Sequence, residues 1–304
     1  MINRNQQLVL CPPAKINLIL RVGGCLSNGY HSLWSLMQTI GLTDELTLSL
    51  DDSFSGVRLE LEYEGFNLGD PRENLVYRAA TLVLEKVESA VGVNISLGKQ
   101  IPVAAGLGGG SSDAAATILG LNQLLGSRLS LTEMIFLGAE IGSDVPFFFA
   151  APTAVIQGTG EQIAPVVLPG HRWILLINPG FPIQTKLAYQ RLDEVRGAGF
   201  HSTFDRNVLN GRGSLSWEEV IPLIKNDFED VLLEDYPELA YIKGALLAAG
   251  AEASLVSGSG ASMFGIFSNE SRAQQAKTLF VPKSAWQVFV VPVKTEGLLS
   301  ENMS

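Results

Sequence analysis

The sequence predicts an α+β fold that is divided into two domains. Its 304 residues exceed one average domain, and 46% of them are apolar, which is enough to fill a substantial core. Segments with strand periodicity and segments with helical periodicity are mixed along the whole chain, which favours packed α+β layers over a helical array. We expect an N-terminal domain over residues 1–163 and a C-terminal domain over residues 164–304.

The first half is predicted to contain both strands and helices. Alternating apolar positions predict strands over 14–22, 45–50, 57–63 and 93–97, and the turn at 23–29 indicates a hairpin after the first of them. Helical periodicity predicts helices over 74–89, 111–126 and 131–141. Asn74 is a suitable N-cap for the first helix, Gly126 ends the second, and Ser130 with Glu133 forms a capping box for the third.

The second half repeats this mixture in a compact order. We expect a strand over 173–178, a helix over 237–250, a strand–glycine turn–strand unit over 253–267, a helix over 271–280 and a strand over 286–293. This order predicts a small α+β sandwich in the C-terminal domain.

Charge and composition exclude several classes of partner. The formal net charge is −10 and the chain has no long run of Lys or Arg, which disfavours nucleic acid and anionic membrane surfaces. The most apolar segment, 145–156, is interrupted by Pro152 and is shorter than the ~18–20 residues of a membrane span. Cys11 and Cys25 have no metal-binding spacing, and they indicate reduced thiols in a cytoplasmic protein. The sequence identifies no protein ligand for a metal ion.

The segment PVAAGLGGGSSDAA, residues 102–115, carries the clearest chemical signal. Four of its residues 106–110 are glycines, and the segment leads directly into a predicted helix. Backbone N–H groups at such a helix start point to one place, where the helix dipole also favours an anion. We expect the phosphates of a nucleotide to bind along Pro102, Val103, Ala104, Ala105, Gly106, Leu107, Gly108, Gly109, Gly110, Ser111 and Ser112.

Other interpretations of this loop can be compared with the motif rules. A Walker-type loop requires a lysine after the last glycine, and none is present. A dinucleotide fingerprint can begin at Gly106 and Gly108, but its third glycine is misplaced. A flexible turn before a capped helix remains an alternative when the loop is considered alone.

Two further segments extend the signal over most of the chain. PAKINL (13–18), the glycine loop and LVSGSGASMFGIF (255–267) occur in the order of three motifs of the GHMP family of small-molecule kinases, which the sequence therefore resembles. The resemblance implies the two-domain GHMP architecture, an active-site cleft between the domains, ATP as phosphoryl donor and Mg²⁺. NGYHSL (28–33), MQTI (37–40) and IGSDVPFF (141–148) are most similar to the branch that acts in the non-mevalonate isoprenoid pathway. The implied acceptor is a cytidine-diphosphate-linked alcohol.

Two residues are the candidates for catalysis. By residue type alone, Lys15 could be a solvated strand lysine and Asp144 a turn or cap aspartate. The resemblance implies that Lys15 is the active-site lysine beside the acceptor hydroxyl and that Asp144 is the base that removes its proton. Asn17 should share the strand face of Lys15 and could contact the substrate diphosphate or the lysine.

Recognition of the acceptor is assigned to aromatic residues. Tyr30 and His31 follow a glycine turn, where they could also form an ordinary hairpin tip. The resemblance implies that Tyr30 stacks on the cytosine, that His31 hydrogen-bonds it, and that Tyr189 reaches its other face, although a helical tyrosine is more often a core residue. It also places the turn at Ser257–Ala261 beside the substrate across the cleft.

Two other functions remain open from the sequence. The chain could phosphorylate a different alcohol, such as homoserine or mevalonate, or it could be a catalytically silent relative that binds ATP and signals through protein contacts. The joint presence of Lys15 and Asp144 favours an enzyme, because a sensor needs only the glycine loop. We expect a monomer or a weak homodimer.

Overall fold

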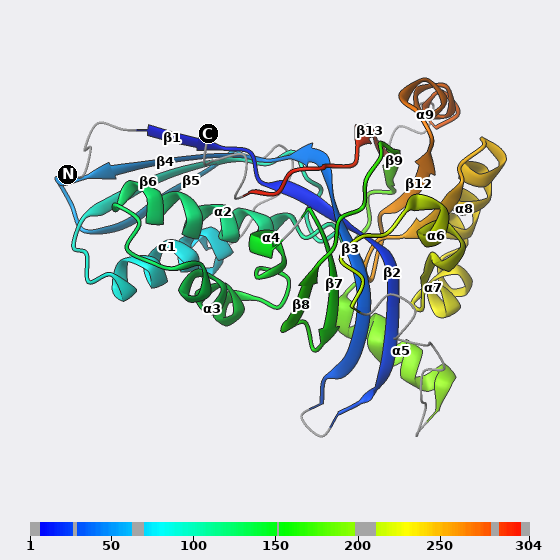
Figure 1. Cartoon of the computed structure of the whole chain (residues 1–304), viewed down its shortest axis with the longest axis horizontal. Helices are drawn as coiled ribbons and strands as arrows, with labels where there is room; N and C mark the ends of the chain where they lie inside the picture. The colour runs from blue at the N-terminus through cyan, green and yellow to red at the C-terminus, as the bar shows by residue number, and fades with distance from the viewer. Residues whose placement is uncertain are drawn as a thin grey trace.

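The computed structural model describes residues 7–26, 29–62, 70–150, 152–197, 211–280 and 286–298. It contains three β-sheets with helices packed against them (Figure 1), so the predicted α+β class is confirmed. Residues 27–28 of the predicted turn and residue 63 of the predicted strand 57–63 lie outside the described residues. No helix in the described ranges is long and apolar enough to cross a membrane.

The first sheet and its helices form the N-terminal layer pair. Its strand order is β1 (Gln7–Leu10), β4 (Glu45–Asp51), β6 (Gly92–Gly98) and β5 (Gly56–Glu62). The helices α1 (Leu75–Lys86), α2 (Gly109–Leu124) and α3 (Leu131–Ile141) lie on one side of it (Figure 1), after a short 3₁₀ turn at Pro71–Glu73. Alternate strand residues such as Leu46 and Leu48 are fully buried there, as strand periodicity requires.

The predicted helix signals in this half are confirmed. The Asn74 side chain accepts a hydrogen bond from Val76 N at 2.9 Å, and Ser130 and Glu133 form the capping box. Helix α1 ends before its predicted limit because Glu88 has a positive φ of 52°, which a right-handed helix cannot continue. Helix α2 begins at Gly109, two residues before its predicted start, so the last glycines of the loop belong to its first turn.

The central sheet contains strands from both halves of the chain. Its order is β10 (Lys225–Asn226), β2 (Pro13–Cys25), β3 (His31–Thr43), β7 (Thr153–Gly158) and β8 (Gln162–Pro165), and the short helix α4 (Phe147–Ala150) precedes β7. Strands β2 and β3 form the predicted hairpin. Strand β10 pairs with β2 in parallel, and its two residues are too short to show periodicity in the sequence. The predicted division after residue 163 falls within β8, and it stays a prediction.

The third sheet has the order β11 (Ala253–Val256), β12 (Met263–Phe267), β9 (Trp173–Asn178) and β13 (Gln287–Pro292). The helices of this half are α5 (Thr185–Arg196), α6 (Trp217–Val220), α7 (Glu229–Asp235), α8 (Pro237–Ala248) and α9 (Glu270–Lys277), with a 3₁₀ turn at Ile221–Leu223. Helices α8 and α9 pack against this sheet. The predicted order of helix, strand, turn, strand, helix and strand is therefore confirmed.

The chain after β13 returns to the N-terminal half. Val293 bridges to Ile40, and Lys294 N donates to Thr39 O at 3.0 Å. Gln38 Nε2 donates to the carbonyl oxygen of Lys294 at 2.8 Å, and Leu298 is buried in the N-terminal core. Both β10 and this return thus join the two halves of the chain.

Candidate active site

Two cavities meet at the glycine loop. The larger, of about 1000 Å³, lies between β2, the segment 139–146, α5 and the turn at Ser257–Ala261, and the smaller, of about 370 Å³, follows residues 102–111. Both cavities are lined by Gly106 and Gly108. A molecule in the smaller cavity would therefore lie next to a molecule in the larger one at these two glycines.

The glycine loop has the backbone that its sequence requires. Gly106 and Gly108 have φ values of 78° and 67°, which favour glycine. Gly108 is the N-cap of α2 and provides no side-chain cap, so N–H groups of the first turn are left for a ligand. Lys15 N donates to Leu107 O at 2.9 Å, and a Cβ atom on Gly108 would lie 2.9 Å from Lys15 Cγ. The loop therefore rests directly on the lysine.

The structure places most of the predicted nucleotide-binding residues together. Residues 102–111 all line the smaller cavity. Ser112 is fully buried on α2, and its Oγ has no hydrogen-bond partner among the described residues. The binding of nucleotide phosphates by these residues stays a prediction.

Lys15 and Asp144 face each other across a short distance. Lys15 Nζ lies 3.5 Å from Asp144 Oδ2, and their side chains are 5% and 34% exposed. Lys15 Nζ also donates to Asn17 Oδ1 at 2.8 Å, while Asn17 Nδ2 donates to Ser35 Oγ at 2.9 Å. The lysine is thus buried and oriented, which differs from a solvated strand lysine. Sequence motifs predicted Lys15, Asn17 and Asp144 as site residues, and in the structure their side chains lie together.

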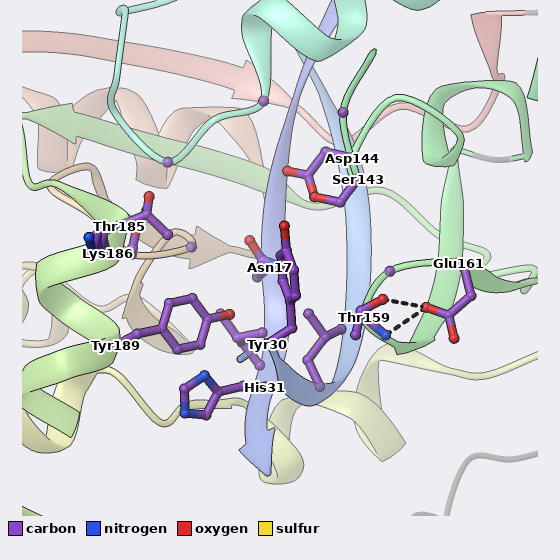
Figure 2. Close-up of a pocket in the computed structure, with 18 of the residues that line it drawn as sticks. Asn17, Tyr30, His31, Ser143, Asp144, Thr159, Glu161, Thr185, Lys186 and Tyr189 are labelled. Carbon is purple, nitrogen blue, oxygen red and sulfur yellow. Dashed lines mark hydrogen bonds between the residues drawn. The ribbon is translucent and has the colours of Figure 1, made fainter. Parts of the chain in front are cut away.

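The aromatic residues gather at one part of the larger cavity (Figure 2). Tyr30 is 66% exposed, and the His31 ring stacks on Tyr189 with centroids 4.8 Å apart. His31 Nε2 lies 2.8 Å from Asp193 Oδ1, a contact that the sequence did not predict. Burial, together with the Asp144 carboxylate, raises the pKa of Tyr189 to about 12, so its phenol stays neutral at ordinary pH. The roles of Tyr30, His31 and Tyr189 toward a base stay predictions.

An ion triad beneath the glycine loop was missed by the sequence analysis. Lys99 Nζ contacts Asp44 Oδ2 and lies 2.7 Å from Asp113 Oδ2, and all three side chains are nearly inaccessible to solvent. Asp44 Oδ1 also accepts hydrogen bonds from the backbone N–H groups of Gln100 and Ile101. The triad therefore fixes both the start of the loop and the first turn of α2. Its members are far apart in the sequence and have no shared motif.

The triad predicts a pH dependence of stability. Burial, to which the Asp44 carboxylate adds, raises the pKa of Asp113 from its ordinary value of 3.8 to about 7 in the folded chain, against the opposing effect of Lys99. Between these values the folded state binds more protons than the unfolded state, so this group's contribution to the free energy of unfolding falls as the pH rises. In Asp113→Asn this contribution is absent. Urea unfolding at about pH 4 and about pH 8 should show the variant gaining stability relative to wild type at the higher pH. An equal difference at both pH values would contradict this assignment.

Comparison with known proteins gives the class of protein first. The family model described as "GHMP kinases N terminal domain" matches residues 74–151, and the model described as "GHMP kinases C terminal" matches residues 213–278. The chain belongs to the GHMP kinase family. The resemblance seen in the three glycine-containing motifs is confirmed, and so is the use of ATP as phosphoryl donor.

Relatives that align over nearly the full length of the chain have a more specific name. A protein of Geobacter metallireducens named 4-diphosphocytidyl-2-C-methyl-D-erythritol kinase is 40% identical over 289 residues, which cover 95% of this chain and 99% of the relative. A protein of the same name from Syntrophus aciditrophicus is 40% identical, with 93% and 98% covered. A crystal structure of 4-(cytidine 5'-diphospho)-2C-methyl-D-erythritol kinase has a TM-score of 0.74 and 31% identity, with 93% of this chain and 99% of that chain covered.

Proposed function

We propose that this chain transfers the γ-phosphoryl group of ATP to the 2-hydroxyl of 4-diphosphocytidyl-2-C-methyl-D-erythritol in the non-mevalonate isoprenoid precursor pathway. The main support for the transfer step is the Lys15–Asp144 pair. Its Nζ and Oδ2 atoms lie 3.5 Å apart, beside the glycines that line both cavities. The choice of acceptor is supported by the names of the full-length relatives. A cytoplasmic location and a monomer or weak homodimer are part of the same proposal.

In the proposed reaction, the acceptor oxygen attacks the γ-phosphorus while the bond to the bridging oxygen of ADP breaks. Asp144 takes the hydroxyl proton, and the Lys15 ammonium stabilises the developing charge on the oxygen and on the phosphoryl group. Asn17 orients the Lys15 ammonium toward the reacting oxygen by accepting a hydrogen bond from it at 2.8 Å. The N–H groups at the start of α2 would hold the donor phosphates. Mg²⁺ bound together with ATP would neutralise charge on the phosphates during the transfer.

Measurement of ADP release tests the proposal directly. Release should be stimulated by 4-diphosphocytidyl-2-C-methyl-D-erythritol and not by homoserine or mevalonate, and the product should carry phosphate on the 2-hydroxyl. Stimulation by homoserine or mevalonate instead would show a different acceptor. ATP binding without ADP release under any acceptor would indicate the catalytically silent alternative.

Tyr30→Ala should weaken binding of the acceptor selectively. Stacking of a base on an aromatic ring contributes roughly 1–3 kcal/mol, so the KM for the acceptor should rise about 5- to 150-fold while that for ATP stays nearly unchanged. Phe136→Ala is the matched control, since Phe136 is also 66% exposed but lies on α3 and does not line the cavity. An equal rise of both KM values in Tyr30→Ala would remove this residue from the acceptor site.

A further inference from the structure

Four consecutive residues that no motif singled out lie where the parts of the cleft meet. Asn226, Asp227, Phe228 and Glu229, here called the 226–229 segment, join β10 to α7 and are between 0% and 9% exposed. The segment belongs to the second half of the chain. Because β10 pairs with β2, the segment nevertheless lies against the first half. Its side chains contact different walls of the cleft.

Asn226 and Glu229 hold the turn at Ser257–Ala261. Asn226 Nδ2 donates to the carbonyl oxygens of Val256 at 2.9 Å and Gly258 at 2.7 Å. Glu229 Oε1 accepts a hydrogen bond from Val256 N at 3.0 Å. The same turn reaches the glycine loop, since Ser257 Oγ donates to Gly106 O at 2.9 Å. A continuous series of contacts therefore leads from Asn226 to the loop that lines both cavities.

Asp227, in contrast, contacts β2 and α5. Its Oδ2 accepts a hydrogen bond from Val22 N at 2.9 Å and lies 3.0 Å from Arg196 Nη2, while its Oδ1 lies 3.3 Å from Arg21 Nε. Arg196 Nη1 also donates to Val22 O at 2.9 Å. One buried carboxylate thus connects β2, which leads into the hairpin with Tyr30 and His31, to the last turn of α5.

Phe228 completes this connection inside the larger cavity. Its ring meets that of Tyr189 edge-on, with centroids 4.9 Å apart, and it lines the cavity itself. Tyr189 and Asp193 both lie on α5, and both contact His31. The position of α5 relative to the hairpin therefore decides how these rings are arranged.

We propose that the 226–229 segment is a positioning element with two separable effects. Asp227 positions the aromatic residues that are expected to bind the acceptor, and Asn226 positions the glycine loop that is expected to bind the nucleotide. The inference rests on the proposed function for the identity of the acceptor. Asp227→Asn keeps the side-chain shape but leaves Arg196 and Arg21 without their shared buried charge. Asn226→Asp replaces the amide group, with its two N–H donors, by one acceptor oxygen that faces two carbonyl oxygens.

The test uses the full chain with both isosteric variants and with Asp235→Asn as the matched control. Asp235 also forms an ion pair with α5, through Arg191 at 3.1 Å, but both side chains are about a third exposed, so little should change. Titration calorimetry with CMP and with ADP reports binding at the two sites, and hydrogen exchange reports the opening of the backbone.

Asp227→Asn should weaken CMP binding about tenfold and speed hydrogen exchange in residues 31–35 and 185–196, while ADP binding stays within about twofold of wild type. Asn226→Asp should weaken ADP binding about tenfold and speed exchange in 256–260.

Three results would overturn the inference: equal losses for both nucleotides in each variant, no loss in either, or exchange changes that spread over the whole chain. If Asp227→Asn does not fold, Arg196→Gln removes the α5 side of the same contact and must give the same pattern. Failure of the proposed function is seen separately. A wild-type chain that does not bind CMP or does not phosphorylate the cytidine-bearing alcohol contradicts that function, while the exchange patterns of the two variants still decide whether the segment positions the two walls.

Discussion

Replacement of Asp144 by Asn is expected to lower kcat by about 10²–10⁴-fold, with little change in the KM of either substrate. The amide keeps the size of the side chain but cannot accept the proton of the acceptor hydroxyl. Lys15 Nζ, 3.5 Å away, would still attract the phosphoryl oxygens, so binding of the donor should persist. Steady-state kinetics with both substrates varied, together with a pre-steady-state measurement of the chemical step, separates the two effects.

The control for this variant is Glu140→Gln. Glu140 is an exposed carboxylate at the end of α3 that also lines the larger cavity, so its replacement changes the charge of the cleft without removing the proposed base. Its kcat should stay within about threefold of wild type, as expected for an exposed charge. Near-normal turnover in Asp144→Asn, or an equal loss in Glu140→Gln, would rule out Asp144 as the base.

Gly106→Ala is expected to disrupt the meeting point of the two cavities. The residue has a φ of 78°, and a Cβ atom would lie 2.1 Å from the carbonyl oxygen of Ser257 and 3.1 Å from that of Gly260. Both neighbours are backbone atoms, so the loop and the turn must move apart. Displacement of catalytic groups by about 1 Å can cost on the order of 10²-fold in rate, and we expect kcat/KM for ATP to fall by about that amount.

Gly126→Ala separates conformational cost from collision. Gly126 lies just after α2 with a similar φ of 86°, but a Cβ atom there would meet nothing within 4 Å. This control should lose about 1–2 kcal/mol of unfolding free energy and keep its kcat/KM for ATP. Thermal unfolding and kinetics of both variants would test the difference. If the two variants behave alike, the contact between Gly106 and Ser257 has no role in the site.

Local sequence signals predicted most of the individual elements. The Asn74 cap, the Ser130–Glu133 capping box and the glycine after α2 each act within a few residues, so their effect is visible without tertiary structure. Alternation predicted β4, β5 and β6 for the same reason. Strand β10 was missed because two residues have no period, and its pairing with β2 depends on a partner some 200 residues away in the sequence.

The candidate site was predictable to the extent that its residues lie in motifs. Lys15, Asn17, Asp144 and the glycine loop were found because each stands in a segment typical of the family. Asp44, Lys99 and Asp227 stand in no such segment, and charged residues of this kind are ordinarily solvated. Only the folded structure shows that these side chains are paired and buried, with exposed fractions of 0%, 6% and 1%.

The sequence by itself thus predicted a kinase, because the order of three family motifs is visible without the fold. It also predicted a phosphate-binding loop at a helix start, because glycine conformations and helix dipoles are local properties. The tertiary structure decided what lies around that loop. Lys15 is buried against Asp144, an ion triad lies beneath the first turn of α2, and the 226–229 segment connects both walls of the cleft. These arrangements depend on contacts between distant segments, and a buried charge acquires its partner only when the chain has folded.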